Sequence, residues 1–430
     1  MRLIPRLQTL SRREAHSFHY PGHKGRLEAF GLQDLLALDT TETFGTDNLL
    51  HPRDILRQTQ EELGKIFGSL STSIGVGGST MALYASLYAL CDEGDKIVVD
   101  RRVHKSIHQM ARLLHLEVLS FSKEAPLRRE MVQGAKAAVF VHPTYYGEGI
   151  DEKAFALAKE EGLLLLVDEA HGAHLPFFDR SRSALDLGAD LVVQSAHKSL
   201  PSLTQTALLH RTSDRVSPEV LEEAVAMFSS TSPSYVFMAS VEKAVDWMAH
   251  HGKEKLLLLE ETIDTCYEAL ASMGVRRRDQ VDPFKLVISI PGRTGEELYH
   301  RLYEDFGLAM EFYDMTSVVA VVTVADEPED IEALTRACLA IGPGEADVPA
   351  PLSFSHVPEW QGLGRTREWV ELDKALGRVA SHSLVPYPPG IGLILPGEVY
   401  DERVLTTLRE ALSQGIVVEG VEGRRVEVFQ

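Results

Sequence analysis

The chain has 430 residues, which is too long for one small core and suits two or three packed domains. Apolar residues at 44% and charged residues at 25% are ordinary for a soluble globular protein, and a net charge of −20 disfavours nucleic acid and anionic membrane as partners. No apolar run approaches the ~20 residues of a membrane span. The 3 cysteines are widely spaced without a metal-type pattern, which fits a reducing cytoplasm.

The first fifty residues predict a helix, a turn and a loop. Residues 1–13 have the pattern of a short amphipathic helix that packs on a partner subunit or on the small domain. PGHKG at 21–25 predicts an ordered turn, and TETFGTDNLLHP at 41–52 predicts a polar loop. ILRQTQEELGKIF then has apolar residues at helical spacing within 53–67.

A glycine-rich stretch leads into the next predicted helix. In SIGVGGSTMALYASLYAL at 73–90, glycines precede a Ser-Thr pair and a long apolar helix. Backbone amides and two hydroxyls therefore gather at a helix N-terminus, which favours a phosphate, so Ser79 and Thr80 are candidate phosphate ligands. The stretch is neither a Walker A loop nor a GxGxxG motif, and an ordinary N-cap remains the alternative.

Two strands that end in loops follow. DKIVVDRRVHKS at 95–106 predicts a strand, a loop and a helix start. His104 and His108 have helical spacing, but no HExxH pattern and no nearby third ligand accompany them, so we predict no metal site. AAVFVHPTYYGEGID at 137–151 predicts another strand and loop, with Thr144 placed to touch a cofactor and Tyr145 to line a cavity. A helix with acidic residues at its start comes next.

An acid stands at the end of the most apolar strand. LLLLVDEAHGAH at 163–174 predicts a parallel strand covered on both faces, with Asp168 where it ends. Ligands of open α/β sheets bind beyond the carboxyl ends of strands. A carboxylate there can pair with the pyridinium nitrogen of pyridoxal phosphate (PLP) and keep it protonated. Alone, Asp168 would be read as a cap of the next helix.

Lys198 lies in a predicted turn between two core strands. The strands are GADLVV at 188–193 and TALLH at 206–210. An ammonium near the interior is costly unless it is paired or neutral, and a neutral lysine can form a Schiff base with a carbonyl. A lysine that reaches solvent from a loop is the alternative. Neighbouring polar donors, Ser195 and His197 among them, favour a phosphate-bearing aldehyde cofactor.

The rest of the chain predicts a second domain. FSSTSPSYVFMASVE at 228–242 predicts a hydroxyl-rich loop that enters a helix, which continues to about residue 273. FKLVISI, ELYHRLYEDFG and SVVAVVTV then form a β-α-β pattern. A Pro-rich connection at 342–358 precedes VPYPPGIGLILPGE at 385–398.

DEAHGAH and SAHKSLPSLTQ, together with PGHKG and PTYYG, resemble the PLP-dependent ornithine/lysine/arginine decarboxylases of bacterial type, over residues 20–398. The resemblance implies the type I fold of the aspartate aminotransferase group, with a mostly parallel seven-stranded sheet in the large domain and a small α+β C-terminal domain. We expect an N-terminal segment at 1–40, the large domain at 41–280 and the small domain at 281–430. The chain is shorter than the large inducible members, and we expect it to lack their extra N-terminal domain.

The resemblance also assigns roles. Lys198 would hold PLP as a Schiff base, Asp168 would protonate its ring nitrogen, His104 would stack on the ring and His171 would orient it. The expected phosphate ligands are Ser79, Thr80, Ser195 and His197, with Ser230 or Thr231 reaching the site of a neighbouring subunit. Candidate substrate contacts are His23, Lys24, Asp47, Glu148 and Glu398.

The sequence therefore predicts a cytoplasmic PLP-dependent decarboxylase that converts arginine, lysine or ornithine to a polyamine precursor. Its expected assembly is a homodimer or a higher even homo-oligomer. Another fold-type-I PLP enzyme, such as an aminotransferase or aldolase, could use the same lysine and aspartate. A binding protein that retains the fold without turnover is the other alternative.

Overall fold

The computed structural model describes residues 16–43, 46–179, 182–346, 348, 356–364, 366–387, 392–413 and 415–430. The expected helix at 1–13 lies outside the described residues, as does part of the Pro-rich connection. No helix in these ranges combines the length and the apolar composition needed to cross a membrane.

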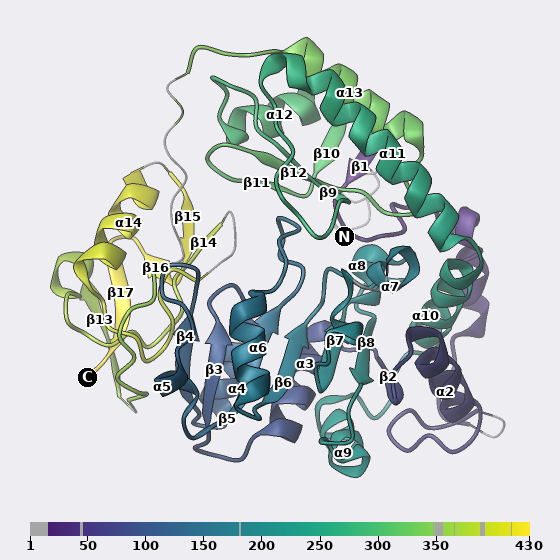
Figure 1. Ribbon diagram of the computed structural model, residues 1–430, viewed down its shortest axis with the longest axis horizontal. Helices are drawn as coiled ribbons and strands as arrows, with labels where there is room; N and C mark the ends of the chain where they lie inside the picture. The colour runs from purple at the N-terminus through teal and green to yellow at the C-terminus, as the bar shows by residue number, and fades with distance from the viewer. Residues whose placement is uncertain are drawn as a thin grey trace, which may run out of the picture.

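A seven-stranded sheet forms the centre of the molecule, in the order β2-β8-β7-β6-β5-β3-β4 (Figure 1). Its strands are β2 (Ser71–Gly75), β3 (Lys96–Asp100), β4 (Glu117–Phe121), β5 (Ala135–Val141), β6 (Leu164–Asp168), β7 (Leu191–Gln194) and β8 (Ala207–Arg211). The pairs from β7 to β4 are parallel, and β8 runs antiparallel to both of its neighbours. The predicted mostly parallel sheet is confirmed.

Successive side chains of a strand point to opposite faces of the sheet, so alternate residues are buried in two separate cores. In β6, Leu165 and Val167 belong to one core and Leu166 to the other. The helices and short helical segments of this part of the chain are η1 (Leu27–Phe30), η2 (Gln33–Leu38), α2 (Ile55–Phe67), α3 (Gly78–Leu90), α4 (Lys105–Leu113), α5 (Arg129–Val132), α6 (Glu152–Glu160), α7 (Leu175–Phe178), η4 (Ala184–Asp186), α8 (Ala196–Ser199) and α9 (Pro218–Phe228). The helices α3, α4 and α9 cover one face, and α6 covers the other. This arrangement explains why the strands are apolar throughout.

A long helical stretch leads from the large sheet to a smaller one. It comprises α10 (Tyr235–Trp247), the π-helical turn η5 (Met248–Gly252), α11 (Lys253–Leu270) and η6 (Ala271–Met273), close to the predicted helix at 236–273. The predicted β-α-β elements appear as β9 (Lys285–Ile288), α12 (Gly295–Phe306) and β12 (Val318–Val321). The remaining elements are β1 (His16–Phe18), β10 (Leu308–Met310), β11 (Phe312–Tyr313) and α13 (Pro328–Ile341). An antiparallel sheet in the order β11-β12-β9 and a parallel β1-β10 pair result.

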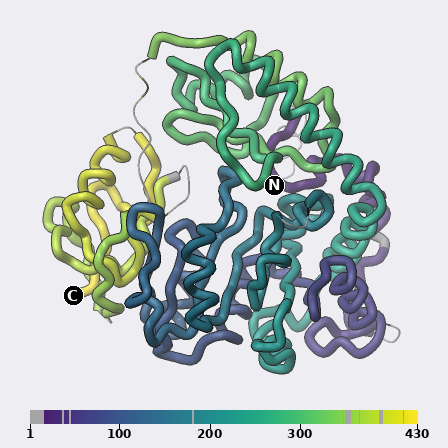
Figure 2. Tube along the Cα trace, viewed as in Figure 1, coloured from purple at the N-terminus to yellow at the C-terminus, as the bar shows by residue number. Residues whose placement is uncertain are grey.

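The last part of the chain has its own core and lies beside the β3-β4 edge of the large sheet (Figure 2). Its elements are β13 (Arg367–Glu371), η7 (Leu372–Lys374), β14 (Val385–Tyr387), α14 (Glu402–Ser413), β15 (Val417–Glu419), β16 (Val421–Glu422) and β17 (Arg425–Phe429). Residues after 281 thus form two groups of sheets, one with α12 and α13 and one with α14. Ion pairs such as Lys105 with Glu419, 3.0 Å apart, join the second group to the large sheet.

Candidate active site

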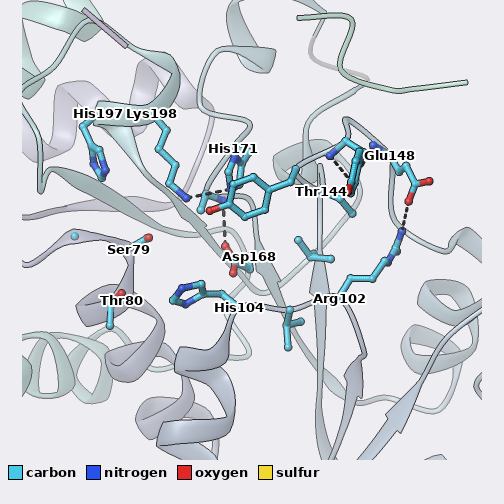
Figure 3. A pocket seen from close by; sticks show the side chains of 16 residues that line it. Ser79, Thr80, Arg102, His104, Thr144, Glu148, Asp168, His171, His197 and Lys198 are labelled. Atoms are coloured by element: carbon cyan, nitrogen blue, oxygen red, sulfur yellow. Dashed lines mark hydrogen bonds and ion pairs between the residues drawn. The ribbon is translucent and has the colours of Figure 1, made fainter. Parts of the chain in front are cut away.

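A cavity of about 260 Å³ opens at the carboxyl ends of the parallel strands (Figure 3). Asp168 ends β6, and Lys198 lies in α8, directly after β7. Because β6 and β7 are parallel neighbours, their ends bring the two side chains to the same cavity. The predicted residues that line it are Ser79, Thr80, His104, Thr144, Tyr145, Glu148, Asp168, His171, His197 and Lys198.

The Lys198 side chain points into the cavity between two aromatic rings. Its Nζ lies 5.4 Å from the ring centroid of Tyr145 and 5.7 Å from that of Tyr20. Burial lowers the pKa of Lys198, while the nearby carboxylates of Asp168 and Glu311 act in the opposite direction. A lowered pKa increases the fraction of Lys198 that is present as the neutral, nucleophilic amine at a given pH.

Asp168 is almost fully buried. Burial raises the pKa of its carboxyl group, and the Ala170 backbone N–H and any positive charge on Lys198 oppose that rise. The Ala170 N–H donates to Oδ1 at 3.1 Å. A carboxyl group in this position can share or hold a proton for a basic nitrogen in the cavity.

His171 connects Lys198 to Tyr20. Its Nε2 lies 3.0 Å from Lys198 Nζ, and its Nδ1 lies 2.7 Å from the Tyr20 hydroxyl. The Tyr145 ring packs on the imidazole with centroids 4.1 Å apart. Burial is the main cause that lowers the pKa of His171 well below its ordinary value, and positive charge on Lys198 or Lys285 acts in the same direction. Burial alone therefore favours the neutral ring.

The N-terminus of α3 forms one wall. Gly78 has a φ of +74°, which allows the chain to turn into the helix, and Gly78, Ser79 and Thr80 line the cavity there. The Ser195 hydroxyl donates to Ser79 Oγ at 2.8 Å, so Ser195 reaches this wall through Ser79. His197 lines the same end, with Nδ1 2.8 Å from the Thr206 carbonyl oxygen.

His104 caps α4 and projects its ring into the cavity (Figure 3). Its Nδ1 accepts from the Ser106 backbone N–H at 3.3 Å. Burial, and then the charges of Lys198 and Lys105, lower the pKa of His104 to about 4. The imidazole is therefore neutral and presents a flat face. In the described ranges, no three His, Cys, Asp or Glu side chains are arranged to hold a metal ion.

Thr144 and Glu148 shape the opposite wall. Thr144 Oγ1 accepts from the Glu148 backbone N–H at 3.2 Å, which fixes the turn that carries both residues. The Glu148 carboxylate is half-buried and lies 3.4 Å from the Arg102 guanidinium. Arg102 is held mainly by Asp100, with contacts of 3.0 and 2.8 Å.

Other expected site residues lie outside this cavity. Asp47 accepts from the backbone N–H groups of Arg53, Asp54 and Leu56 at the start of α2. Burial raises the pKa of Asp47, but the backbone donors outweigh it and the net shift is downward. Glu398 forms a buried ion pair with Arg101. Within one chain, both carboxylates already have partners.

The PGHKG turn lies next to α8 without lining the cavity. Lys24 Nζ donates to the carbonyl oxygens of His19 and Val321 at 2.8 and 2.9 Å. His23 Nδ1 accepts from the Gly25 N–H at 3.0 Å. Ser230 and Thr231 are exposed in the loop between α9 and α10, away from the cavity of their own chain.

Four residues of the site were not among the residues predicted from the sequence. Arg102 and Tyr146 line the cavity. Tyr20 contacts His171, and Glu311 accepts from the Tyr20 N–H at 2.9 Å. Tyr146 follows Tyr145 directly, so the PTYYG motif could have indicated it; Glu311 comes from the small sheet, and only tertiary structure brings it here.

Solved structures of other proteins have the same fold. The lysine decarboxylase LdcF of Francisella novicida has a TM-score of 0.76 at 18% identity, over 94% of this chain and 78% of that one. A structure of SPT with PLP has a TM-score of 0.58 at 18% identity, over 79% of this chain and 96% of that one. The fold is that of the fold-type-I PLP enzymes, as predicted.

Sequence relatives define the family. The arginine decarboxylase of Bacillus subtilis (strain 168) is 30% identical over 97% of this chain and 95% of its own length. The profile of the Orn/Lys/Arg decarboxylase major domain matches residues 3–119 and 120–289, and that of the C-terminal domain matches 361–414. This chain belongs to the Orn/Lys/Arg decarboxylase family, and the resemblance predicted from the sequence is confirmed.

Proposed function

We propose that this chain is a PLP-dependent decarboxylase of arginine, lysine or ornithine. The observation that carries the proposal is the cavity shared by Lys198 and Asp168, in a chain of the Orn/Lys/Arg decarboxylase family. The product would be a diamine or agmatine, a precursor of polyamines.

The residues of the cavity fit PLP. Lys198 Nζ is the cavity-facing amine that would hold the aldehyde carbon, and Asp168 is the buried acid that would face the ring nitrogen. Ser79 and Thr80 at the start of α3, with Ser195 behind and His197 beside them, offer donors for a phosphate. His104 offers a ring to stack on the pyridine, while Thr144 and His171 border it.

PLP, when bound, supplies an electron sink for cleavage of a bond at Cα. The chain supplies orientation and protons. Asp168 would keep the ring nitrogen protonated, and His104 and the other walls of the cavity would orient the ring. His171 Nε2 and Lys198 Nζ, 3.0 Å apart, are the groups in this part of the cavity that could move a proton to or from the substrate.

Glu148 is the acid that we assign to the distal cation of the substrate. Of the three acids expected from the sequence, it lines the cavity, whereas Asp47 and Glu398 lie elsewhere. A substrate ammonium or guanidinium would replace the Arg102 contact, which at 3.4 Å is longer than the contacts of Arg102 with Asp100. An unpaired cation in the cavity would be costly without this carboxylate.

We further propose that the active unit is a dimer. Ser230 and Thr231 are exposed hydroxyl residues on the loop before α10, where they have no access to their own cavity. A second subunit would bring this loop to the phosphate of its neighbour and complete the site at the interface.

The test follows the absorption spectrum. Wild-type protein with PLP should show a visible band that shifts when a basic amino acid is added. After borohydride reduction, peptide mapping should find the pyridoxyl group on Lys198. Lys198→Ala should bind PLP only noncovalently and have no turnover, whereas normal turnover in that variant would reject the assignment.

A further inference from the structure

Three side chains form a continuous hydrogen-bonded chain that ends at the reactive amine. The Tyr20 hydroxyl lies 2.7 Å from His171 Nδ1, and His171 Nε2 lies 3.0 Å from Lys198 Nζ. Figure 3 shows the second of these contacts as a dashed line. Tyr20 belongs to the N-terminal segment and is not among the residues that line the cavity. The roles assigned above do not include it.

The position of Tyr20 is fixed against α8. The Gly22 N–H donates to the His197 carbonyl oxygen at 2.7 Å, and the Tyr20 N–H donates to Glu311 at 2.9 Å. A Cβ at Gly22 would lie 2.5 Å from the Leu200 carbonyl oxygen, so only glycine permits this close approach. The backbone thus holds the phenol in one place relative to Lys198.

The protons of the chain can be assigned by counting donors and acceptors. In the described part of the molecule, the Tyr20 hydroxyl has one hydrogen-bond partner, His171 Nδ1. If the hydroxyl accepted a proton from Nδ1, its own proton would have no acceptor among the described groups, which is costly at a partly buried site. The hydroxyl therefore donates to Nδ1. Burial, and then Glu311, raise the pKa of Tyr20 well above its ordinary value, so the phenol keeps its proton.

The remaining ring proton is consequently on Nε2. His171 is neutral, so it carries one ring proton, and Nδ1 is already an acceptor. The Nε2–H then points at Lys198 Nζ, which must accept through its lone pair. Only the neutral amine has that lone pair; an ammonium at the same place would be opposed by the Nε2–H.

We propose that Tyr20 is a positioning residue that holds His171 in the Nε2–H tautomer, so that Lys198 is presented as a neutral nucleophile. The inference rests on the proposed function only in taking Lys198 as the amine that reacts with a carbonyl. It assigns to the N-terminal segment a chemical task at the site.

The test measures the acidity of Lys198 in the full chain, after dialysis against hydroxylamine to remove bound aldehyde. Trace acetylation with acetic anhydride at a series of pH values, quantified by mass spectrometry against exposed Lys65, gives the midpoint at which Lys198 becomes reactive. The charged and titratable groups that face Lys198 or His171 are Tyr20, Tyr145, His104, Asp168, His197, Lys285 and Glu311. They are the same in all variants except at the substituted position.

Tyr20→Phe should raise the midpoint by about one pH unit, the equivalent of one hydrogen bond. Without the donor, the Nδ1–H tautomer becomes accessible, and its Nε2 accepts from a Lys198 ammonium. At a pH below the midpoint, acetylation of Lys198 should fall about tenfold relative to wild type. In protein labelled with ¹⁵N-histidine, the ring shifts of His171 should change from the Nε2–H form to a mixture.

Tyr145→Phe is the matched control. Tyr145 packs on the same imidazole and lies as close to Lys198 as Tyr20 does, but its hydroxyl makes no hydrogen bond to His171 in the described structure. Its midpoint should equal that of wild type. In a His171→Phe background, Tyr20→Phe should have no further effect on Lys198. Thermal unfolding of each variant establishes that it is folded.

An unchanged midpoint in Tyr20→Phe, an equal shift in Tyr145→Phe, or a shift that persists without His171 would each overturn the proposal. The measurement needs neither PLP nor turnover. If Tyr20→Phe shifts the midpoint but the wild-type protein decarboxylates no amino acid, the proposed function is rejected and this inference is supported. If the midpoint does not shift and the wild-type protein is an active decarboxylase, the proposed function is supported and this inference is rejected.

Discussion

The Arg101 guanidinium and the Glu398 carboxylate form an ion pair in which the two side chains are 0% and 3% exposed. Arg101 follows β3 and also donates to the Leu393 carbonyl oxygen at 2.8 Å, while Glu398 accepts from the Leu395 N–H at 2.8 Å. The pair therefore joins the sheet that carries His104 to the C-terminal group of strands.

Loss of one partner of this pair should destabilise the protein. Glu398→Ala should lower the free energy of unfolding by about 3 kcal/mol, because an arginine remains buried without a counter-charge. Urea unfolding measures it. The double variant Arg101→Met, Glu398→Leu should recover most of the loss. A stable Glu398→Ala protein with a much higher KM for a basic amino acid would instead make Glu398 a substrate residue.

Glu148 should affect substrate binding and leave PLP binding intact. Glu148→Gln should raise the KM for the preferred basic amino acid about 30-fold, which corresponds to about 2 kcal/mol for a desolvated charge pair. Steady-state kinetics and a PLP titration separate the two effects. Glu152→Gln, four residues further on and exposed, removes the same charge outside the cavity and should behave as wild type. Equal effects in the two variants would point to long-range charge alone.

The buried His210 should make the fold sensitive to acid. Burial lowers the pKa of His210 to about 3, whereas an unfolded histidine titrates near 6.5. Between these values only the unfolded chain takes up the proton, so stability falls as the pH decreases from about 6.5 towards 3.

His210→Gln should remove this contribution. Gln can still bond to Thr72 and Gln194, the present partners of the imidazole. The loss of unfolding free energy between pH 8 and pH 5 should be smaller by about 2 kcal/mol than in wild type. Urea unfolding at the two pH values measures it, and an identical loss in both proteins would exclude His210 as the cause.

Assembly should control activity. If Ser230 or Thr231 completes the phosphate site of a neighbour, dilution to monomer should release PLP and abolish turnover together. Analytical ultracentrifugation with parallel assays measures both. A fully active monomer would exclude this arrangement.

The central part of the site could be predicted because the ends of apolar strands can be recognised in the sequence. Asp168 and Lys198 each follow a continuous apolar run, and parallel strands place such ends at one edge. The family was predicted from the motifs DEAHGAH, SAHKSLPSLTQ, PGHKG and PTYYG, and the seven-stranded sheet followed from that resemblance. The domain boundaries at 40 and 280 remain a prediction.

Only the tertiary contacts show which of the other candidate residues belong to the site. Asp47 and Glu148 are both acids in polar loops, yet one caps α2 and the other lines the cavity. Glu398 ends the segment VPYPPGIGLILPGE, but its partner Arg101 is 297 residues away. Tyr20 reaches His171 across 151 residues through a turn packed on α8. No local pattern encodes such pairings.

The most direct test of the central claim is a product assay with PLP and arginine, lysine or ornithine in turn. Carbon dioxide and the corresponding amine, agmatine, cadaverine or putrescine, should form in equal amounts from one of the three, with little α-keto acid. Lys198→Ala should form none of them. Stoichiometric keto acid, or a clear preference for an acidic or apolar amino acid, would contradict the account and favour an aminotransferase.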